Sequence, residues 1–261
     1  MCKANIWSMK PLALLLAALA ILALAPLAAA QVVVDIGAVE NNASGTGWST
    51  GNNFLTIHDG ADIVITGTTN DRSVVVEENA TVNITLDGVN IDEYDFEIRP
   101  DANVALTLSG VNTLERIIAR RHTRGATLVI NGSGSLEVSS RVVFSSGIDI
   151  MGNLTIDGGT ITASGFSGIA IHSGNLTINR GTVTATGTPI GSVSPHTGIF
   201  VSLGNLAING GAVTAAGDVG IVVFGGNFAV NGGTVTATGR CMSRSGDIIV
   251  RRVRPRQWFV F

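Results

Sequence analysis

The feature that most constrains the fold is one phrase that the chain repeats four times. "GNLTIDGGTITASG" begins at Gly152, "GNLTINRGTVTATG" at Gly174, "GNLAINGGAVTAAG" at Gly204 and "GNFAVNGGTVTATG" at Gly226. Weaker copies extend the pattern towards the N-terminus. Their turn positions, a small polar residue followed by Gly (by Arg at position 180), fall at residues 66, 87, 109, 131, 157, 179, 209 and 231. The spacings are 21, 22, 22, 26, 22, 30 and 22 residues, which indicates a solenoid with insertions in two coils.

Each repeat alternates apolar and polar residues. In "LTINRGTVTAT" the apolar Leu176, Ile178 and Val183 alternate with threonines, a period-two pattern that is typical of strands with one buried face. Gly and Asn separate these short strands, and no helical periodicity lies between them. The sequence therefore predicts an all-β fold, a right-handed single-stranded parallel β-helix of about 22 residues per coil.

Stacking of such coils aligns equivalent residues along the solenoid axis. We expect side-chain amides to form hydrogen-bonded ladders there, and we expect the glycines after the second ladder, among them Gly158 and Gly210, to adopt positive φ. The two predicted ladders contain Asn153, Asn175, Asn205 and Asn227, and Asp157, Asn179, Asn209 and Asn231.

The ends of the chain differ from its repetitive body. Residues 1–30 carry two lysines, a long apolar run and Ala28–Ala30, which predicts a cleaved signal peptide and a secreted or cell-surface protein; a retained membrane anchor is the alternative. Residues 31–59 are predicted to form an N-terminal cap, and residues 60–239 the β-helix repeats. Residues 240–261 form an atypical basic tail, which indicates either a truncated or frameshifted reading frame or a short attachment segment.

Charge and cysteine content narrow the function. Residues 31–239 contain 18 Asp and Glu against 8 Arg, so nucleic-acid binding is not expected. No apolar run after residue 30 is long enough to span a membrane. Cys2 lies in the predicted signal peptide and leaves Cys241 alone, which excludes a disulfide framework within the mature chain.

The densest group of carboxylates is a candidate calcium site, since Ca²⁺ takes several oxygen ligands in irregular geometry. If Tyr94, Phe96 and Ile98 point inward, the acidic residues between them line an outer face. The alternative is ion pairing with the next coil, where one added period places Ile117 over Asp95 and brings arginines close. The candidate metal ligands are Asp92, Glu93, Asp95 and Glu97.

The segment "ERIIARRHTR" is the one concentration of arginine in residues 31–239. Guanidinium groups match carboxylates with two parallel hydrogen bonds, so this segment is a candidate grip on an acidic sugar polymer. The alternative is a solvated charged loop. The candidate ligand-binding residues are Arg116, Arg120, Arg121 and Arg124.

The sequence assigns no catalytic residue. Hydrolysis of a glycosidic bond requires two facing carboxylates, and residues 126–239 contain only four acidic residues with no convergent set. The four histidines, His58, His122, His172 and His196, are interpreted as surface or loop residues. Threonines such as Thr182 and Thr184 recur as outward rows, which suggests a flat ice-binding surface or simply a good solvent-facing strand residue.

Several segments together carry a family resemblance. "ITLDGVNI", "VALTLSGVNTLE", "ATLVINGSGSLEV" and the serial "GNLTIN"-type coils resemble the secreted bacterial carbohydrate-binding-domain-containing proteins of right-handed parallel β-helix, pectate-lyase-like type. The resemblance spans about residues 60–239. It implies calcium-assisted binding of an acidic polysaccharide, or an adhesin role at the cell surface. "ERIIARRHTR" and the tail depart from the family pattern.

The predicted function is that of an exported, non-catalytic β-helix that binds carbohydrate or a cell-surface glycan, with calcium as the candidate cofactor. The alternative is a polysaccharide lyase or glycoside hydrolase of the pectin-active β-helix type, favoured if Asp92, Asp95 and Arg116 or Arg120 share one groove. A structural spacer or an ice-binding solenoid is the third reading. The sequence does not define an oligomeric state.

Overall fold

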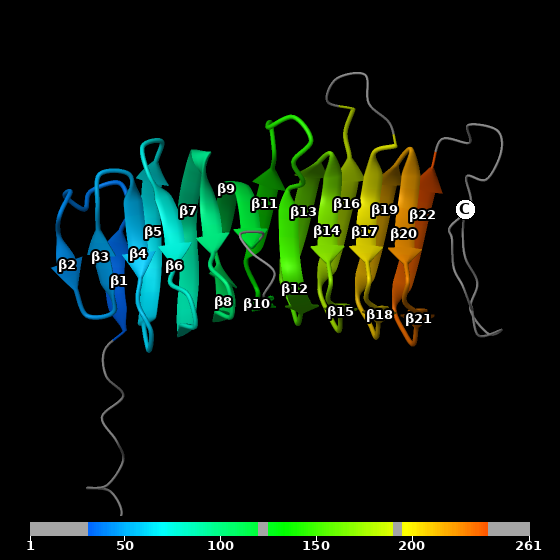
Figure 1. Cartoon of the computed structure of the whole chain (residues 1–261), viewed down its shortest axis with the longest axis horizontal. Helices are drawn as coiled ribbons and strands as arrows, with labels where there is room; N and C mark the ends of the chain where they lie inside the picture. Colours follow the sequence, from blue (N-terminus) through cyan, green and yellow to red (C-terminus); the bar gives the residue numbers. More distant parts are fainter. Residues whose placement is uncertain (1–30, 120–124, 190–194, 240–261) are drawn as a thin grey trace, which may run out of the picture. The chain divides into compact units, whose positions relative to one another are not determined.

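The computed structural model of this 261-residue chain describes residues 31–119, 125–189 and 195–239. The predicted signal peptide, the predicted tail after residue 239, His122 and the candidate arginines Arg120, Arg121 and Arg124 lie outside the described residues. All regular structure in the described ranges is β-strand, arranged as a solenoid of about eight turns (Figure 1). The predicted parallel β-helix is confirmed.

The described strands are short, apart from one that bends around the solenoid. They are β1 (Val32–Asp35), β2 (Ser44–Gly45), β3 (Trp48–Thr50), β4 (Phe54–Ile57), β5 (Asp62–Thr69), β6 (Ser73–Val76), β7 (Thr81–Ile98), β8 (Asn103–Ser109), β9 (Val111–Ala119), β10 (Ala126–Gly132), β11 (Ser135–Ser139), β12 (Ile148–Ile156), β13 (Thr160–Gly165), β14 (Ser167–His172), β15 (Leu176–Ile178), β16 (Thr182–Gly187), β17 (Thr197–Ser202), β18 (Leu206–Ile208), β19 (Ala212–Gly217), β20 (Val219–Phe224), β21 (Phe228–Val230) and β22 (Thr234–Gly239).

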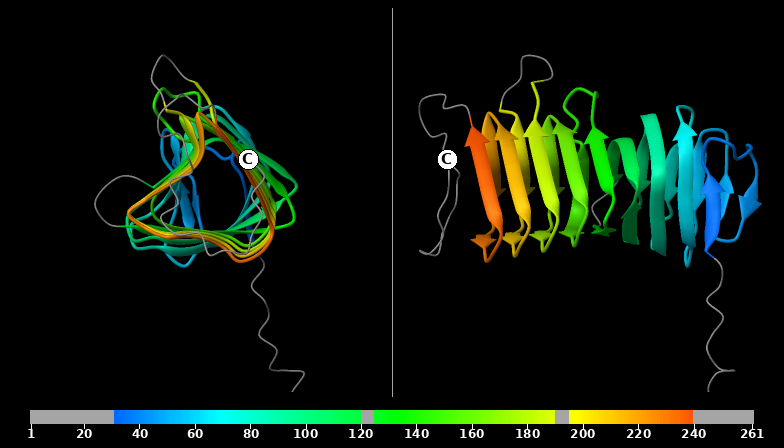
Figure 2. Two further views of the ribbon diagram at one scale, coloured as in Figure 1. Left: turned by 90° about the vertical axis from the view of Figure 1, so that its right-hand side faces the viewer. Right: turned by 180° about the vertical axis from the view of Figure 1, so that it is seen from behind.

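Parallel pairing between successive coils builds three faces. Face A contains β1, β5, β8, β10, β15, β18 and β21, with parts of β7 and β12. Face B contains β11, β13, β16, β19 and β22, preceded by parts of β5, β7 and β9. Face C contains β4, β6, β14, β17 and β20, with parts of β7, β9 and β12. The coils of residues 32–239 give a roughly triangular outline along the axis (Figure 2).

Both insertions predicted from the spacing fall at the same corner, between face B and face C. The shorter one lies between β11 and β12 and projects at the upper edge of Figure 1. The longer one lies between β16 and β17, and residues 190–194 of it are outside the described ranges. Strand register continues across both insertions, since β11 pairs with β13 and β14 pairs with β17. The corner therefore accepts extra residues without disturbing the stack.

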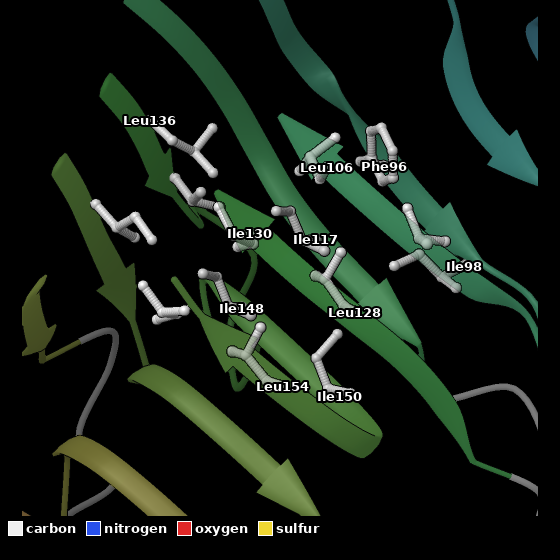
Figure 3. Close-up of a cluster of buried hydrophobic side chains, with 14 of the residues drawn as sticks. Phe96, Ile98, Leu106, Ile117, Leu128, Ile130, Leu136, Ile148, Ile150 and Leu154 are labelled. Carbon is white, nitrogen blue, oxygen red and sulfur yellow. The ribbon is translucent and has the colours of Figure 1, made fainter. Parts of the chain in front are cut away.

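The core is a column of aliphatic side chains inside the coils. Each strand contributes its inward residues, so that Leu128, Leu154 and Leu176 of face A stack directly on one another and are fully buried. Figure 3 shows part of this core, with Leu128, Leu154 and Phe96 among the labelled side chains; Phe96 is the largest fully buried side chain in the described ranges. A single coil cannot bury its apolar side chains without the coils above and below it. The fold therefore depends on stacking, which explains why the sequence repeats the same segment in successive coils.

The two predicted ladders are confirmed. On the first, Asn175 donates a side-chain hydrogen bond to Asn153 (3.1 Å), and Asn205 and Asn227 continue the pattern (2.9 and 3.1 Å). Backbone N–H groups of the same asparagines donate to the same oxygens. The second ladder, at Asp157, Asn179, Asn209 and Asn231, has N···O distances of 2.6, 2.7 and 2.7 Å.

The glycine expected at positive φ is misplaced by one residue in these coils. Positive φ occurs at Gly159, Gly181, Gly211 and Gly233, and not at the preceding position. That preceding position holds Gly in three of the four coils, at Gly158, Gly210 and Gly232, and Arg180 in the other. Because its φ is not in the left-handed region, the backbone conformation there does not require Gly and is compatible with Arg180. A methyl group at Gly158 or Gly210 would still meet a carbonyl oxygen of the coil below, at 2.7 or 2.5 Å.

The N-terminal part of the described chain mixes two kinds of pairing. β1 and β4 pair in parallel with β5 and β6, whereas β2, β3 and β4 pair antiparallel. The capping role of residues 31–59 stays a prediction. Within the described ranges, no helix is long and apolar enough to cross a membrane.

Candidate functional site

The predicted metal ligands lie on face C, where β7 is irregular. Pairing shifts between Ile91, which faces Leu114, and Asp95, which faces Arg116. Glu93 adopts a φ of 77° within this irregularity. The prediction that one period places Ile117 over Asp95 is therefore wrong by one residue, because a bulge changes the local count.

The expected inward residues are confirmed downstream of the bulge. Phe96 and Ile98 are buried in the core, and Tyr94 packs partly buried against it. Glu97 lies on the outer side of the strand, but it is only 9% exposed and approaches Arg99 at 3.7 Å. The four carboxylates thus do not share one open surface.

Arginines from neighbouring coils meet these carboxylates. Arg116 donates two hydrogen bonds of 2.7 Å to the two carboxylate oxygens of Asp95, and a third of 2.9 Å to the hydroxyl of Ser145. Arg141 donates at 2.6 Å to Asp92. The structure shows the ion pairing that the sequence offered as the alternative to a metal.

Calcium binding stays a prediction. Within the described ranges, no group of three or more His, Cys, Asp or Glu side chains is placed to hold a metal ion. A cation at Asp92 or Asp95 would have to replace an arginine that already neutralises the carboxylate.

The hydrogen bonds of Arg116 bear on both of its predicted roles. The hydrogen bond to Asp95 raises the pKa of Arg116 above its ordinary value, and burial opposes this shift in part. A base that abstracts a proton needs the opposite shift. The same ion pair occupies the guanidinium group of Arg116, which would otherwise be available to bind a sugar carboxylate. Arg116 is thus better explained as a link between two coils than as a lyase base.

A pocket of about 460 Å³ lies further along face C, over the coils that follow the charged cluster. Most of its lining is apolar, and the strands beneath it are β12, β14, β17 and β20. We call it the aromatic pocket. Its lining residues are Phe144, Ser146, Asp149, Phe166, Ser167, Ala170, His172, Pro195, Thr197, Phe200, Val219, Val222 and Phe224.

The first row of rings at the pocket follows the corner between faces B and C. Phe144 and Phe166 meet edge to face with centroids 6.0 Å apart, and Phe166 meets His196 in the same way at 5.4 Å. Phe144 is 55% exposed and has a φ of 63°. Such edge-to-face contacts are favourable for aromatic pairs, and they connect rings from three coils. Phe144 and Phe166 line the pocket, whereas the buried His196 does not.

The second row runs along the outer side of face C itself. His172 and Phe200 have centroids 5.8 Å apart, and Phe200 and Phe224 are 6.0 Å apart. Phe224 is 48% exposed. Ala170 aligns with Phe200 and Val222 across adjacent strands, so small and large side chains alternate along the pocket.

Two histidine–carboxylate pairs lie at these rows. His172 Nε2 is 3.3 Å from Asp149 Oδ1, and the Asp149 side chain is 6% exposed. His196 Nδ1 is 2.9 Å from Asp218 Oδ2, and His196 is 4% exposed. His196 lies in the loop that precedes β17, as the sequence indicated, but it is buried there and pairs with Asp218 of the next coil. His58 lies near the surface and pairs with Glu77 at 2.9 Å.

The backbone is closely packed at Gly168 in β14, next to the pocket-lining Ser167. A methyl group at Gly168 would meet backbone atoms of Ala163 and Thr186 at 2.5–2.7 Å, so only Gly allows so close an approach there. The sequence carried one signal of this pocket, since Phe144 and Phe166 are one period apart. The insertion before His196 makes its distance from Phe166 longer than one period. Phe200 and Phe224 also occupy different positions within their repeats.

Face B carries the threonine rows. Thr160, Thr182, Ala212 and Thr234 align across four strands, as do Thr162, Thr184, Thr214 and Thr236. The side chains point outward, away from the buried Ile161 and Val183. The predicted array is present, with the interruption at Ala212.

These features define the class: a parallel β-helix whose third face carries an ion-paired coil junction and an aromatic pocket. Comparison of the chain with protein-family models, with curated proteins and with solved structures finds no match. The family resemblance of the repeats therefore stays a prediction.

Proposed function

We propose that this protein is an exported β-helix that binds carbohydrate without cleaving it, at the aromatic pocket of face C. The observation that carries the proposal is the pair of aromatic rows, which extends over several coils in the direction of the solenoid axis. The apolar C–H faces of sugar rings stack on the electron-rich faces of aromatic rings.

The pocket has the composition of a binding site. It is concave and mostly apolar, with a few polar groups that include Ser167, Thr197 and the pair of Asp149 and His172. Such sites use the apolar surface for affinity and the polar groups for orientation. Successive coils lie about 4.8 Å apart, close to the rise of one sugar unit in an extended glycan, so a chain parallel to the axis could present one unit to each coil.

The proposal moves the expected contact from the coils of residues 87–124 to those of residues 144–224. Export rests on the character of residues 1–30. Attachment to a surface glycan as an adhesin would use the same pocket. A calcium-assisted hold on acidic polysaccharide has less support, because Arg116 and Asp95 already engage each other.

Binding to a panel of soluble oligosaccharides, measured by calorimetry with and without Ca²⁺, tests the proposal. We expect Phe200→Ala and Phe224→Ala to weaken binding about ten-fold each, the cost of losing one stacked ring. Thr184→Ala and Thr236→Ala on face B are matched controls and should bind like the wild type. Ultraviolet absorbance of the same mixtures reports unsaturated sugar ends, whose accumulation would favour the lyase alternative.

The threonine array supports a second candidate, binding of ice. Its two rows extend across four coils and present hydroxyl and methyl groups, and Ala212 interrupts one of them. Growth of an ice crystal in a dilute solution of the protein distinguishes this function cheaply. Faceted crystals that become round in Thr184→Lys would support it, and unshaped crystals would leave face B a solvated surface.

A further inference from the structure

We infer that the aromatic pocket holds an extended, β-1,4-linked glycan along the solenoid axis in three consecutive subsites, one at each hydroxyl of Ser146, Ser167 and Thr197. The inference rests on the proposed function, because it names the kind of chain that the same pocket takes. It goes beyond that proposal by assigning the hydrogen-bonding residues and the length of the bound segment.

Three hydroxyl side chains line the pocket at equivalent positions of successive coils. Each precedes an isoleucine by two residues, and these isoleucines pair in register from β12 to β14 to β17. We call Ser146, Ser167 and Thr197 the hydroxyl row. Because successive coils lie about 4.8 Å apart, the row presents one hydroxyl per coil in the direction of the axis.

The three hydroxyl groups have no hydrogen-bond partner in the part of the chain that the structure describes, and none of their oxygens is fully enclosed by it. Ser146 and Ser167 are 5% exposed and Thr197 is 4% exposed, so little water reaches these side chains. A polar group with so little access to water is costly without a partner. A ligand in the pocket would supply that partner.

The hydroxyl row is bounded at both ends. In the coil before Ser146, the equivalent position holds Glu115, which does not line the pocket and whose carboxylate accepts the backbone N–H of Arg141 at 2.7 Å. In the coil after Thr197, the equivalent position holds Val219, which lines the pocket without a polar group. The row therefore defines three subsites.

Aromatic rings border the hydroxyl row on both sides along the strands. Phe166 of the first row of rings directly precedes Ser167, and Phe200 of the second row follows Thr197 by three residues. A sugar unit can thus stack its C–H face on a ring while a hydroxyl group at its edge reaches the hydroxyl row. Stacking and hydrogen bonding act on the same unit.

Hydroxyl side chains suit a β-1,4-linked chain in particular. Successive units of such a chain are turned over with respect to each other, so opposite edges of the sugar ring alternate along one side of the chain. A Ser or Thr hydroxyl both donates and accepts hydrogen bonds, and it can therefore pair with either edge. Chains with α-1,4 linkages curve, so they would leave a straight row after one or two units.

β-1,4-Linked oligomers of glucose and of xylose, from one to six units long, test the inference by calorimetry. We expect the affinity to rise with each unit up to three and to change by less than about two-fold beyond three. The α-1,4-linked glucose trimer has the same composition as its β-1,4-linked counterpart. It should bind at least about ten-fold more weakly.

Two substitutions exchange the same side chains in opposite directions. Thr197→Val removes one hydroxyl and should weaken binding of the β-1,4-linked trimer about five-fold, the loss of one hydrogen bond. The gain in affinity should then end at two units. Val219→Thr adds a fourth hydroxyl, so the affinity should keep rising up to four units. Thr184→Val on face B is the matched control and should bind like the wild type.

The outcomes separate this inference from the proposed function. If no oligosaccharide of the wider panel binds, or if Phe200→Ala binds like the wild type, carbohydrate binding at this pocket is overturned. If Phe200→Ala loses a ligand but the β-1,4-linked oligomers do not bind, or bind no better than the α-1,4-linked ones, the proposed function stands and the inference is wrong.

The inference is equally wrong if Thr197→Val and Val219→Thr leave the dependence on chain length unchanged. An unfolding curve shows whether Thr197→Val is folded. Should it fail to fold, Val219→Thr decides alone, because it changes a residue that is only partly buried.

Discussion

Asp95 and Arg116 face each other across adjacent coils and join through two hydrogen bonds of 2.7 Å. Their side chains are 26% and 19% exposed, so the pair is partly shielded from water. The contact exists because the irregularity in β7 shifts the pairing register by two residues, from Ile91 opposite Leu114 to Asp95 opposite Arg116. It links the irregular coil to the regular ones that follow.

Removal of Arg116 should therefore weaken the fold. We expect Arg116→Ala to lower the free energy of unfolding by about 2 kcal/mol, because Asp95 keeps its charge without its partner. Urea denaturation measures the change. Asp95→Ala should have a similar effect, and the double variant should cost clearly less than the sum of the two. Arg141→Ala is the control, because its side chain is 64% exposed and its pair with Asp92 lies in water. Additive effects at positions 95 and 116 would contradict the coupling.

The asparagine ladder makes a separate prediction. The Asn205 carboxamide oxygen accepts hydrogen bonds from both the backbone and the side chain of Asn227, and its own side chain donates to Asn175. Asn205→Ala should cost about 2 kcal/mol, since three hydrogen bonds are lost at a partly solvated turn. Thermal unfolding of Asn205→Ala and of the control Thr184→Ala tests this prediction. Equal unfolding midpoints for the two variants would show that the ladder does not stabilise the fold.

Gly174 should tolerate no side chain. A methyl group there would overlap the carbonyl oxygen of Gly152 in the coil below, and the same holds for Gly204 above Gly174. We expect Gly174→Ala to destabilise the protein by about 3 kcal/mol or more, since backbone of two coils must separate. Gly51→Ala is the control, because a methyl group there meets nothing within 4 Å. Circular dichroism on heating compares the two variants.

Leu203 offers a stabilising change. It has a φ of 57° and is 70% exposed, whereas Gly225 holds the equivalent position one coil later with a φ of 72°. Leu203→Gly should raise the free energy of unfolding by about 1 kcal/mol, because Gly adopts this conformation without the clash of a Cβ atom. Leu203→Ala keeps the Cβ atom and should gain nothing. Equal stability of the two variants would show that the backbone there stores no strain.

The pKa of Asp71 leads to a prediction about how the folding stability depends on pH. Hydrogen bonds from Thr69 and then Arg72 lower the pKa of Asp71 below its ordinary value of 3.8. A lowered pKa means that the stabilising contribution is present in full above pH 3.8 and is lost as the pH falls through the lower folded value. The difference in melting temperature between the wild type and Asp71→Asn should stay constant from pH 7 to about pH 5 and shrink below pH 3.8. A difference that already shrinks near pH 5 would mean that the pKa is not lowered.

The regular part of the fold was predictable from the sequence because stacking repeats local information. Asn175 and Asn209, for example, each lie directly above an equivalent Asn in a neighbouring coil. The spacing of the repeats was therefore enough to predict both ladders. The prediction went wrong at Asp95, where a bulge alters the count. It also misplaced the positive φ by one residue, because two consecutive glycines at the turn carry no mark of which one is left-handed.

The aromatic pocket was harder to predict for a different reason. Its walls come in part from residues such as Phe144 and Pro195, which sit on insertions and fall outside the repeat. Asp149 and His172 are separated in sequence, and only the pairing of β12 with β14 places them together. The density of charged residues pointed to Asp95 and Arg116 as site residues instead, and in the structure these two side chains form an ion pair with each other.

Both insertions enter at the corner between faces B and C, and both supply walls of the aromatic pocket, while the strands on either side keep their register. A change in the length of this corner would thus reshape the walls of the pocket while the paired strands beside it keep their register. Two chains with the same ladders and the same core could therefore differ in the shape of this one hollow.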